Sequence, residues 1–133
     1  MELRRRNELD PQDLPGRIIE NAVGGNGPIM SKKMTVGFAT YCEKVGAMQP
    51  HHHAEETIYV VSSDRGWTRY GGTPDNLLYK QPLEAGMILH FDELEWHVFE
   101  YEPGGSVQII FIYGQVDNIR PEEIAAKEAD TCE

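Results

Sequence analysis

From Arg17 onward, the sequence alternates short apolar runs with turn residues. The runs are RIIENAV, MTVGFATYC, TIYVVSS, WTRYG, LLYKQPL, AGMILHF, WHVFEYE and VQIIFIYGQV, and segments such as GGNGP, DRG, GTPDN and PGG separate them. This rhythm is typical of antiparallel strands joined by turns, and none of the runs has the length or period of an amphipathic helix. About eight or nine short strands predict an all-β protein, built as a small barrel or a two-sheet jelly roll.

The two ends of the chain depart from this pattern. Residues 1–16 contain three consecutive arginines and two prolines, which predicts a solvated N-terminal arm. Near the other end, RPEEIAAKEAD has helical spacing, and Pro121 is placed for a first helical turn, so we expect a short helix over 120–130. We therefore expect a single domain over 1–133, with its barrel core at about 34–116.

The acidic composition argues against nucleic acid and anionic membranes as partners. The chain has 133 residues with 12 basic and 22 acidic side chains, which gives a formal net charge of -10. A surface this negative repels nucleic acid and anionic membranes, so neither is an expected partner. The two cysteines, Cys42 and Cys132, form neither a disulfide framework nor a paired metal motif, and no apolar run reaches the roughly 18 residues of a membrane span. We therefore expect a cytoplasmic protein.

Three consecutive histidines and two glutamates lie where a turn gives way to an apolar run. In QPHHHAEETIYVV, His51, His52 and His53 precede Glu55 and Glu56. Imidazole nitrogen with carboxylate oxygen is a usual ligand mix for zinc, iron, manganese or nickel. Because side chains alternate along a strand, either His51 and His53 point inward together or His52 does so alone.

Further downstream, GMILHFDELEWH brings His97 to the end of another turn, so a second strand can converge on the same ion. His90 lies within an apolar run, which predicts a core or cavity histidine rather than a ligand. We take His90 and the phenol of Tyr113 as candidate catalytic residues that carry protons. A polar surface turn or an affinity-tag remnant would also explain three histidines, but their spacing and strand context favour a ligand cluster.

The segment GAMQPHHHAEETIYVVSSDRG, from Gly46 to Gly66, resembles the first motif of the cupin superfamily. That motif runs glycine, five residues, His-x-His, three or four residues, glutamate, and six residues to another glycine. His51 and His53 form the His-x-His pair, and Glu56 occupies the position of the ligand glutamate. Only two residues separate His53 from Glu56, one fewer than the motif requires, so the resemblance implies an irregular backbone here.

The second motif of the same superfamily resembles the segment from Gly86 to His97. Its spacing is glycine, five residues, Pro-x-Gly, two residues, histidine, three residues and asparagine, which Gly86 and His97 fit without adjustment. Asp92, Leu94 and Tyr101 replace the proline, the glycine and the asparagine. The resemblance covers about 34–116 and implies a double-stranded β-helix of the jelly-roll type, in the manner of small single-domain cupins.

The resemblance also implies a metal site with two alternative ligand sets. In the first set, His51, His53, Glu56 and His97 hold the ion, and a kink in HAEE absorbs the shortened spacing. In the second set, a regular strand turns His52 and Glu56 inward with His97. We favour the first, because strands near barrel rims often carry bulges that re-aim side chains.

Cupins include dioxygenases, decarboxylases, isomerases, epimerases, cyclases, lyases and non-catalytic proteins, so the fold does not determine the reaction. We expect a divalent metal ion, Fe, Mn, Zn or Ni, that acts as a Lewis acid on a small polar metabolite in an isomerase, epimerase, cyclase or lyase reaction. The alternatives are an iron-dependent dioxygenase and a non-catalytic module that binds a small ligand. We also expect a homodimer, because unpaired edge strands need covering.

Overall fold

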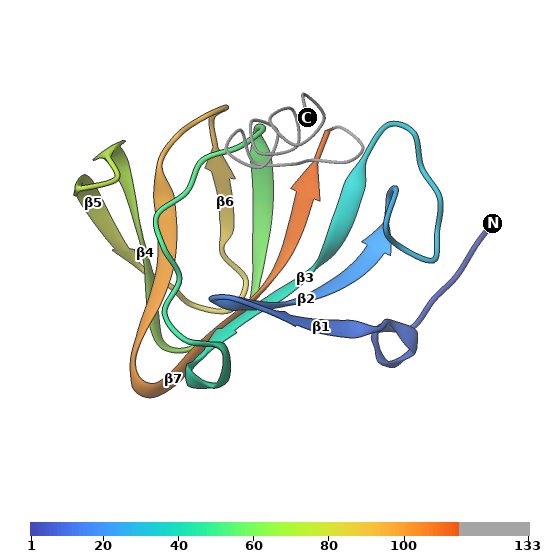
Figure 1. Cartoon of the computed structure of the whole chain (residues 1–133), viewed down its shortest axis with the longest axis horizontal. Helices are drawn as coiled ribbons and strands as arrows, with labels where there is room; N and C mark the ends of the chain where they lie inside the picture. The colour runs from blue at the N-terminus through green and yellow to red at the C-terminus, as the bar shows by residue number, and fades with distance from the viewer. Residues whose placement is uncertain (115–133) are drawn as a thin grey trace, which may run out of the picture.

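The computed structural model describes residues 1–114, which fold almost entirely into antiparallel β-structure (Figure 1). The elements are η1 (Arg6–Glu8), β1 (Pro11–Leu14), β2 (Arg17–Val23), β3 (Thr35–Cys42), η2 (Glu43–Val45), β4 (Glu56–Thr73), β5 (Asn76–Pro82), β6 (Ile88–Phe91) and β7 (His97–Tyr113). Over this range, no helix is both long and apolar enough to span a membrane. The all-β class predicted from the sequence is therefore confirmed.

The strands form one sheet that folds over on itself. Their order is β1-β2-β3-β7-β4-β5, and β6 pairs with the first part of β4. β4 and β7 are the longest strands, with 18 and 17 residues, and they pair with each other along most of their length. Figure 1 shows β7 running down one side of the molecule and up the other. This shared pair connects the two layers of a jelly roll.

The corner between the two layers lies where the sequence predicted turns. DRG and PGG do not end strands; they bend β4 and β7, and the register of the pair shifts between Asp64 and Gly66. Arg65 has a φ of 56°, which places it in the left-handed region. A side chain at Gly66 would clash with that of Val107. Each long strand therefore combines two of the apolar runs, since a bulge with a glycine lets a strand turn without breaking its ladder.

The core lies between the layers and is built from alternate residues of the strands. Ile58 and Val60 of β4 and Val107 of β7 are fully buried, whereas Tyr59 between the first two is 44% exposed. This period of two is expected for strands with one face inward. The remaining members of the core are Ala39, Tyr41, Met48, Leu83, Phe91, Val98, Phe99, Ile109 and Phe111.

The N-terminal segment is more structured than the solvated arm expected from the sequence. β1 pairs with β2, and Leu9 is buried. Arg6 contributes a 2.9 Å ion pair with Glu20 and lies 4.3 Å from the centre of the Phe38 ring. The sheet thus begins at Pro11, ahead of the first predicted strand run at Arg17. The helix predicted over 120–130 lies outside the described residues.

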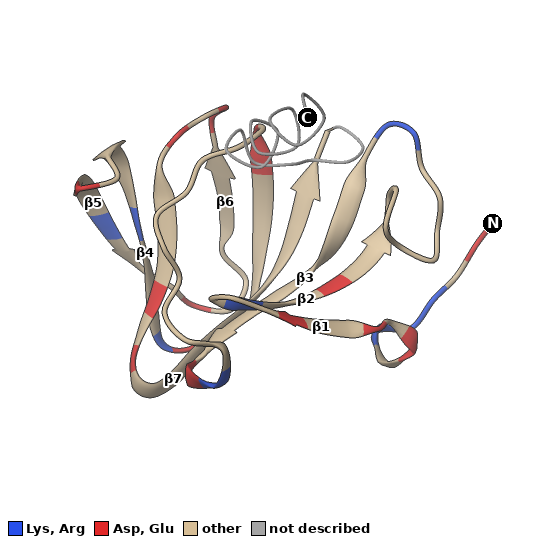
Figure 2. Ribbon diagram, in the orientation of Figure 1, with Lys and Arg blue, Asp and Glu red and all other residues tan. Residues whose placement is uncertain are grey.

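Charged side chains gather at the edges and loops of the described structure. Figure 2 shows that β3 and the last part of β7 are free of charge, in agreement with TVGFATYC and SVQIIFIY. Both segments lie in the middle of the sheet, between β2 and β4. A buried carboxylate is nevertheless present at the first residue of β4, Glu56, which is 3% exposed. A buried carboxylate needs a charged or hydrogen-bonding partner, which directs attention to its surroundings.

Candidate metal centre

The segment that carries the three histidines pairs with the start of β7. The N–H of His51 donates to the carbonyl of His97, and the N–H of His97 donates to the carbonyl of His51, both at 3.0 Å. These two hydrogen bonds fix the two backbones side by side. Two segments far apart in the sequence therefore present their histidine side chains to the same region of the interior.

Three histidines converge in this region. His51, His53 and His97 each offer one ring nitrogen, and these nitrogens lie within 4.8 Å of one another. The residues are 4%, 4% and 1% exposed, respectively. The rings of His51 and His97 have their centres 4.4 Å apart. Such a group is able to hold one metal ion, because a single ion can be reached by all three nitrogens.

Glu56 brings a carboxylate oxygen next to the three histidines. Its Oε1 lies 3.5 Å from Nε2 of His97 and 3.8 Å from Nε2 of His53. On a regular strand, His53 and Glu56 would face opposite ways, because three positions separate them. The backbone instead bends at Ala54 before β4 begins. This bend is the irregularity implied by the shortened cupin motif, and it turns Glu56 toward the histidines.

The hydrogen bonds of the three histidines define which nitrogen faces the cluster. Each Nδ1 lies against a backbone carbonyl: that of Gln49 for His51 at 3.1 Å, of Ala54 for His53 at 3.0 Å and of Glu95 for His97 at 2.7 Å. A carbonyl only accepts hydrogen bonds, so each Nδ1 carries the proton. In the neutral ring, Nε2 then keeps its lone pair, as in histidines that bind metals.

The chemistry of this group fits a divalent cation. Nε2 of His97 is buried and has no hydrogen-bond partner in the described structure. Its near neighbour is an oxygen of Glu56, which also accepts hydrogen bonds when ionised. Buried acceptors that face one another without a donor are unfavourable, and a cation among them removes this cost. Three imidazoles and a carboxylate suit zinc, iron, manganese or nickel alike.

Aromatic packing holds the ring of His97 in place. Phe91 of β6 stacks on it with ring centres 4.1 Å apart and an angle of 7° between the planes. Phe91 in turn contacts Phe99 edge to face, with centres 6.2 Å apart. With its Nδ1 bonded to Glu95 and one face covered by Phe91, the ring of His97 has little freedom. Phe91 and Glu95 were not predictable as part of the site, because an aromatic core residue and a backbone carbonyl leave no motif in the sequence.

Tyr113 lies beside the cluster. Its hydroxyl is 3.5 Å from Nε2 of His53, and its ring meets that of His53 edge to face at 5.0 Å. It is paired with Glu56 across the β4–β7 ladder, which explains why the two side chains emerge together. The structure thus places this candidate catalytic residue next to the proposed ligands.

His52 lies outside the cluster. Its ring stacks on the indole of Trp96, with centres 3.9 Å apart and planes 10° from parallel. Its Nδ1 donates to the carbonyl of Leu94 at 3.2 Å. The alternation of the strand turns His52 away from His51 and His53. The structure therefore brings together the first of the two ligand sets and not the second.

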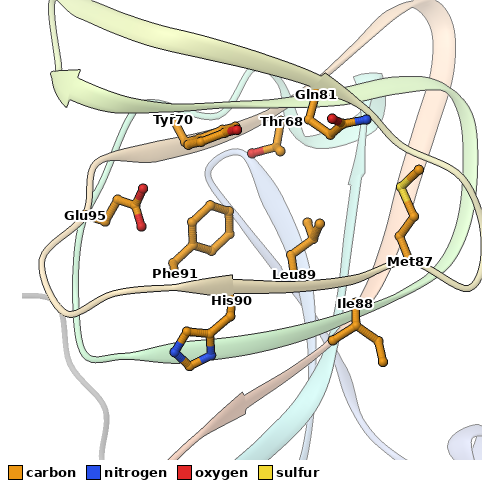
Figure 3. A pocket seen from close by; sticks show the side chains of 9 residues that line it. All are labelled: Thr68, Tyr70, Gln81, Met87, Ile88, Leu89, His90, Phe91 and Glu95. Atoms are coloured by element: carbon orange, nitrogen blue, oxygen red, sulfur yellow. The ribbon is translucent and has the colours of Figure 1, made fainter.

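His90 is not a core histidine, but it is one of the residues that line the cavity in Figure 3, so the cavity alternative of the prediction agrees with the structure. Figure 3 shows its side chain on the opposite side of β6 from Leu89 and Phe91. The side chain is 48% exposed, and its ring lies 2.9 Å from Oγ1 of Thr57 in β4 and 3.5 Å from the carboxylate of Glu55, the residue directly before β4. In AGMILHF, alternation turns Leu89 and Phe91 inward and His90 outward. The proposed proton-carrying role of His90 at the metal cluster has no geometric support.

A cavity of about 470 Å³ is lined by side chains from the second half of β4, from β5 and from β6 (Figure 3). Its walls combine apolar and aromatic side chains with uncharged polar ones and a single acidic side chain, Glu95. Phe91 belongs to both the cavity and the metal cluster, since its ring also covers His97. The other lining residues are Thr68, Tyr70, Gln81, Met87, Ile88, Leu89 and His90. This volume is in the range of small-molecule sites.

The ion pair between Arg69 and Glu100, in which the pKa of Glu100 is lowered, lies away from the histidine cluster. The guanidinium of Arg69 donates to both carboxylate oxygens of Glu100, with Nη2 to Oε2 at 2.8 Å, and Trp67 donates from Nε1 at 3.0 Å. The hydrogen bonds from Arg69, and then that from Trp67, hold the pKa of Glu100 below its ordinary value, against the opposing effect of burial. This group connects β4 to β7 and stabilises the scaffold.

The comparisons with known proteins agree with this architecture. No family model and no curated protein matches the sequence. Among solved structures, the polyketide cyclase RemF from Streptomyces resistomycificus is similar with a TM-score of 0.70 and 17% identity, over 91% of this chain and 82% of that chain.

Two further enzymes are larger. Hydroxypropylphosphonic acid epoxidase from S. wedmorenis has a TM-score of 0.62 and 12% identity, over 85% of this chain and 59% of its own. Oxalate decarboxylase OxdC from Bacillus subtilis, in a mutant form, has a TM-score of 0.65 and 15% identity, over 90% of this chain and 32% of its own. At these identities, the likeness concerns the fold. Together with the two-layered antiparallel sheet and the clustered histidines, it identifies the fold of this chain as that of the cupin superfamily.

Proposed function

We propose that the protein is a metal-dependent enzyme that acts on a small molecule, and that His51, His53, His97 and Glu56 hold its divalent ion. The observation that carries this proposal is the arrangement of the three imidazoles, whose Nδ1 atoms are bound to backbone carbonyls while a buried carboxylate faces their other side. Within residues 1–114, Nε2 of His97 has no hydrogen-bond partner. A purely structural core would leave two acceptors, Nε2 of His97 and Oε1 of Glu56, facing each other at 3.5 Å without a donor between them.

Each residue of the cluster has a distinct part. The carbonyl-bound Nδ1 atoms keep the imidazoles in one tautomer and one orientation, so little reorganisation accompanies metal binding. The carboxylate of Glu56 offsets one of the two positive charges of the ion. Phe91 covers one face of His97 and excludes water from it. When bound, a divalent ion supplies a Lewis acid for a carbonyl or enediol oxygen.

Tyr113 is the residue best placed to move a proton. Its hydroxyl lies within 3.5 Å of a ligand nitrogen of His53. A substrate atom that approaches the cluster therefore also approaches the Oη of Tyr113, which can donate a proton or a hydrogen bond to it. Replacement by phenylalanine keeps the ring packing against His53 and removes only this hydroxyl. The expected result is a lower kcat with unchanged metal content.

We favour an isomerase, epimerase, cyclase or lyase reaction on a small polar metabolite. The similar structures include a polyketide cyclase, and oxalate decarboxylase also acts on a small organic molecule. An iron-dependent oxygenase reaction is the second candidate. It is favoured by the likeness to Fe(II)-HppE, with 12% identity and a TM-score of 0.61, because the nitrogen and oxygen ligands here also suit Fe(II).

Metal analysis of the purified protein, before and after dialysis against a chelator, tests the proposal. We expect about one divalent ion per chain, a loss of thermal stability on its removal, and loss of the ion in the His97→Gln variant. His90→Ala is the matched control, since it removes an exposed histidine on the far side of β6. Absence of metal together with no effect of the chelator would support a non-catalytic module instead. Oxygen uptake by the iron-loaded protein would favour the oxygenase.

A further inference from the structure

We propose that His52, the middle residue of the histidine triplet, is a positioning residue that sets the metal affinity without touching the ion. This inference rests on the proposed metal site. Its side chain lies on the opposite side of the strand from His51 and His53, and it contacts the loop between β6 and β7. That loop carries the groups that orient His97, so His52 connects the first ligand segment to the second.

Two contacts join His52 to the loop. The imidazole stacks almost parallel on the indole of Trp96, with ring centres 3.9 Å apart. Its Nδ1–H donates to the carbonyl of Leu94 at 3.2 Å. Trp96 is the residue directly before the ligand His97. The stacking therefore restrains the backbone immediately ahead of that ligand.

The loop itself has a shape that needs such a restraint. Leu94 adopts a φ of 61°, a left-handed conformation that is unfavourable for a branched side chain. Its N–H donates to the carbonyl of His53 at 2.8 Å, while its own carbonyl accepts from His52. Leu94 is thus bound from both sides by the histidine segment. A tight turn in which Glu95 N–H donates to Asp92 at 3.1 Å completes the loop.

The consequence for the metal site follows along the chain. The carbonyl of Glu95, between Leu94 and Trp96, accepts the 2.7 Å hydrogen bond from Nδ1 of His97. If the His52 contacts are lost, the strained loop is free to relax, and this carbonyl changes position. His97 then loses the group that fixes its tautomer and its ring orientation. Groups of this kind, one step removed from the ligands, typically contribute a factor of about 10 to 100 in metal affinity.

The experiment measures the affinity for Co²⁺ by competition with a chromophoric chelator, and the visible spectrum of the bound Co²⁺. The variants are His52→Ala and Trp96→Ala, which each remove the stacking, and His52→Phe, which keeps a ring on Trp96 but loses the hydrogen bond. His90→Ala is the matched control for the loss of a partly exposed histidine. The free energy of unfolding of each metal-free protein is measured alongside.

We expect His52→Ala and Trp96→Ala to bind Co²⁺ about 10- to 100-fold more weakly with an altered spectrum, His52→Phe to recover part of the affinity, and His90→Ala to match the wild type. A merely structural His52 would lower the metal-free stability but leave the Co²⁺ affinity and spectrum unchanged, which would overturn the inference. Complete loss of binding in His52→Ala, equal to that in His97→Gln, would instead identify His52 as a ligand and also overturn it. Wild-type protein that binds no Co²⁺ overturns the proposed metal site itself.

Discussion

Replacement of Glu56 by glutamine has opposite expected effects on the metal-free and the metal-loaded protein. In the metal-free state with neutral imidazoles, Glu56 is 3% exposed, and its carboxylate lies 3.5 Å from Nε2 of His97, which has no hydrogen-bond partner among residues 1–114. Glutamine has nearly the same shape, but its amide donates a hydrogen bond. Glu56→Gln therefore replaces a contact between two acceptors with a hydrogen bond.

The magnitude follows from the burial of the pair. One new hydrogen bond contributes about 0.5–1.5 kcal/mol to the free energy of unfolding. For a domain of this size, about 1 kcal/mol raises the Tm by roughly 3–5 °C. With metal, the sign reverses. At a free metal concentration of about 100 Kd, the wild type gains about 2.7 kcal/mol, whereas a variant that binds about 100-fold more weakly gains only about 0.4 kcal/mol.

The assay is thermal and urea unfolding at about pH 8.5, well above the pKa of about 6.5 that histidine has in model peptides. Each protein is measured after removal of metal with a chelator and again with added Zn²⁺. Glu55→Gln is the matched control, because Glu55 is the adjacent residue and its side chain is 67% exposed. A Glu56→Gln variant that is less stable than the wild type without metal would contradict this expectation, as would equal stabilisation of both proteins by Zn²⁺.

Three further predictions concern the scaffold and the assembly. Arg69 lowers the pKa of Glu100 in the folded state, so Glu100 stabilises the fold at neutral pH and loses this contribution as the pH falls below its ordinary pKa of 4.5. Glu100→Gln should lower the free energy of unfolding by about 1 kcal/mol at pH 7, given the partial exposure of the pair, and should flatten the acid side of the pH–stability curve. Unchanged urea midpoints of the variant at pH 7 and pH 4 would contradict this. Leu94→Gly should raise the free energy of unfolding by about 0.5–1 kcal/mol, because the energy gained by relieving the left-handed strain exceeds the entropy cost of a more flexible unfolded chain. A lower urea midpoint would show that the Leu94 side chain stabilises the fold by more than its strain costs. The homodimer remains a prediction. If the apolar outer face is the dimer contact, Ile88→Asp, at a 72% exposed position that pairs with Tyr59, should give a monomer in light scattering with an unchanged Tm. A wild-type protein that is monomeric at micromolar concentration would refute the dimer.

The strand pattern was predictable because each strand buries alternate residues, and this period is visible in runs such as TIYVVSS. The connections between runs were less so. DRG and PGG have the composition of turns, yet they bend β4 and β7 without ending them. A tight turn and a bulge at a corner use the same residue types, since both need a left-handed backbone. Only the partner strand decides between them.

The sequence by itself determined the all-β class and the set of residues from which the metal site is drawn. The types and spacing of these residues specify a cluster of histidines and a carboxylate at residues 51–56, and one further histidine, His97, far downstream. The tertiary structure decided that His51 and His53 face inward while His52 faces Trp96, that Tyr113 lies beside His53, and that His90 points outward. The physical reason is that a strand's alternation fixes only which residues share a side. The bend at Ala54 and the pairing of His51 with the start of β7 decide which side becomes the interior.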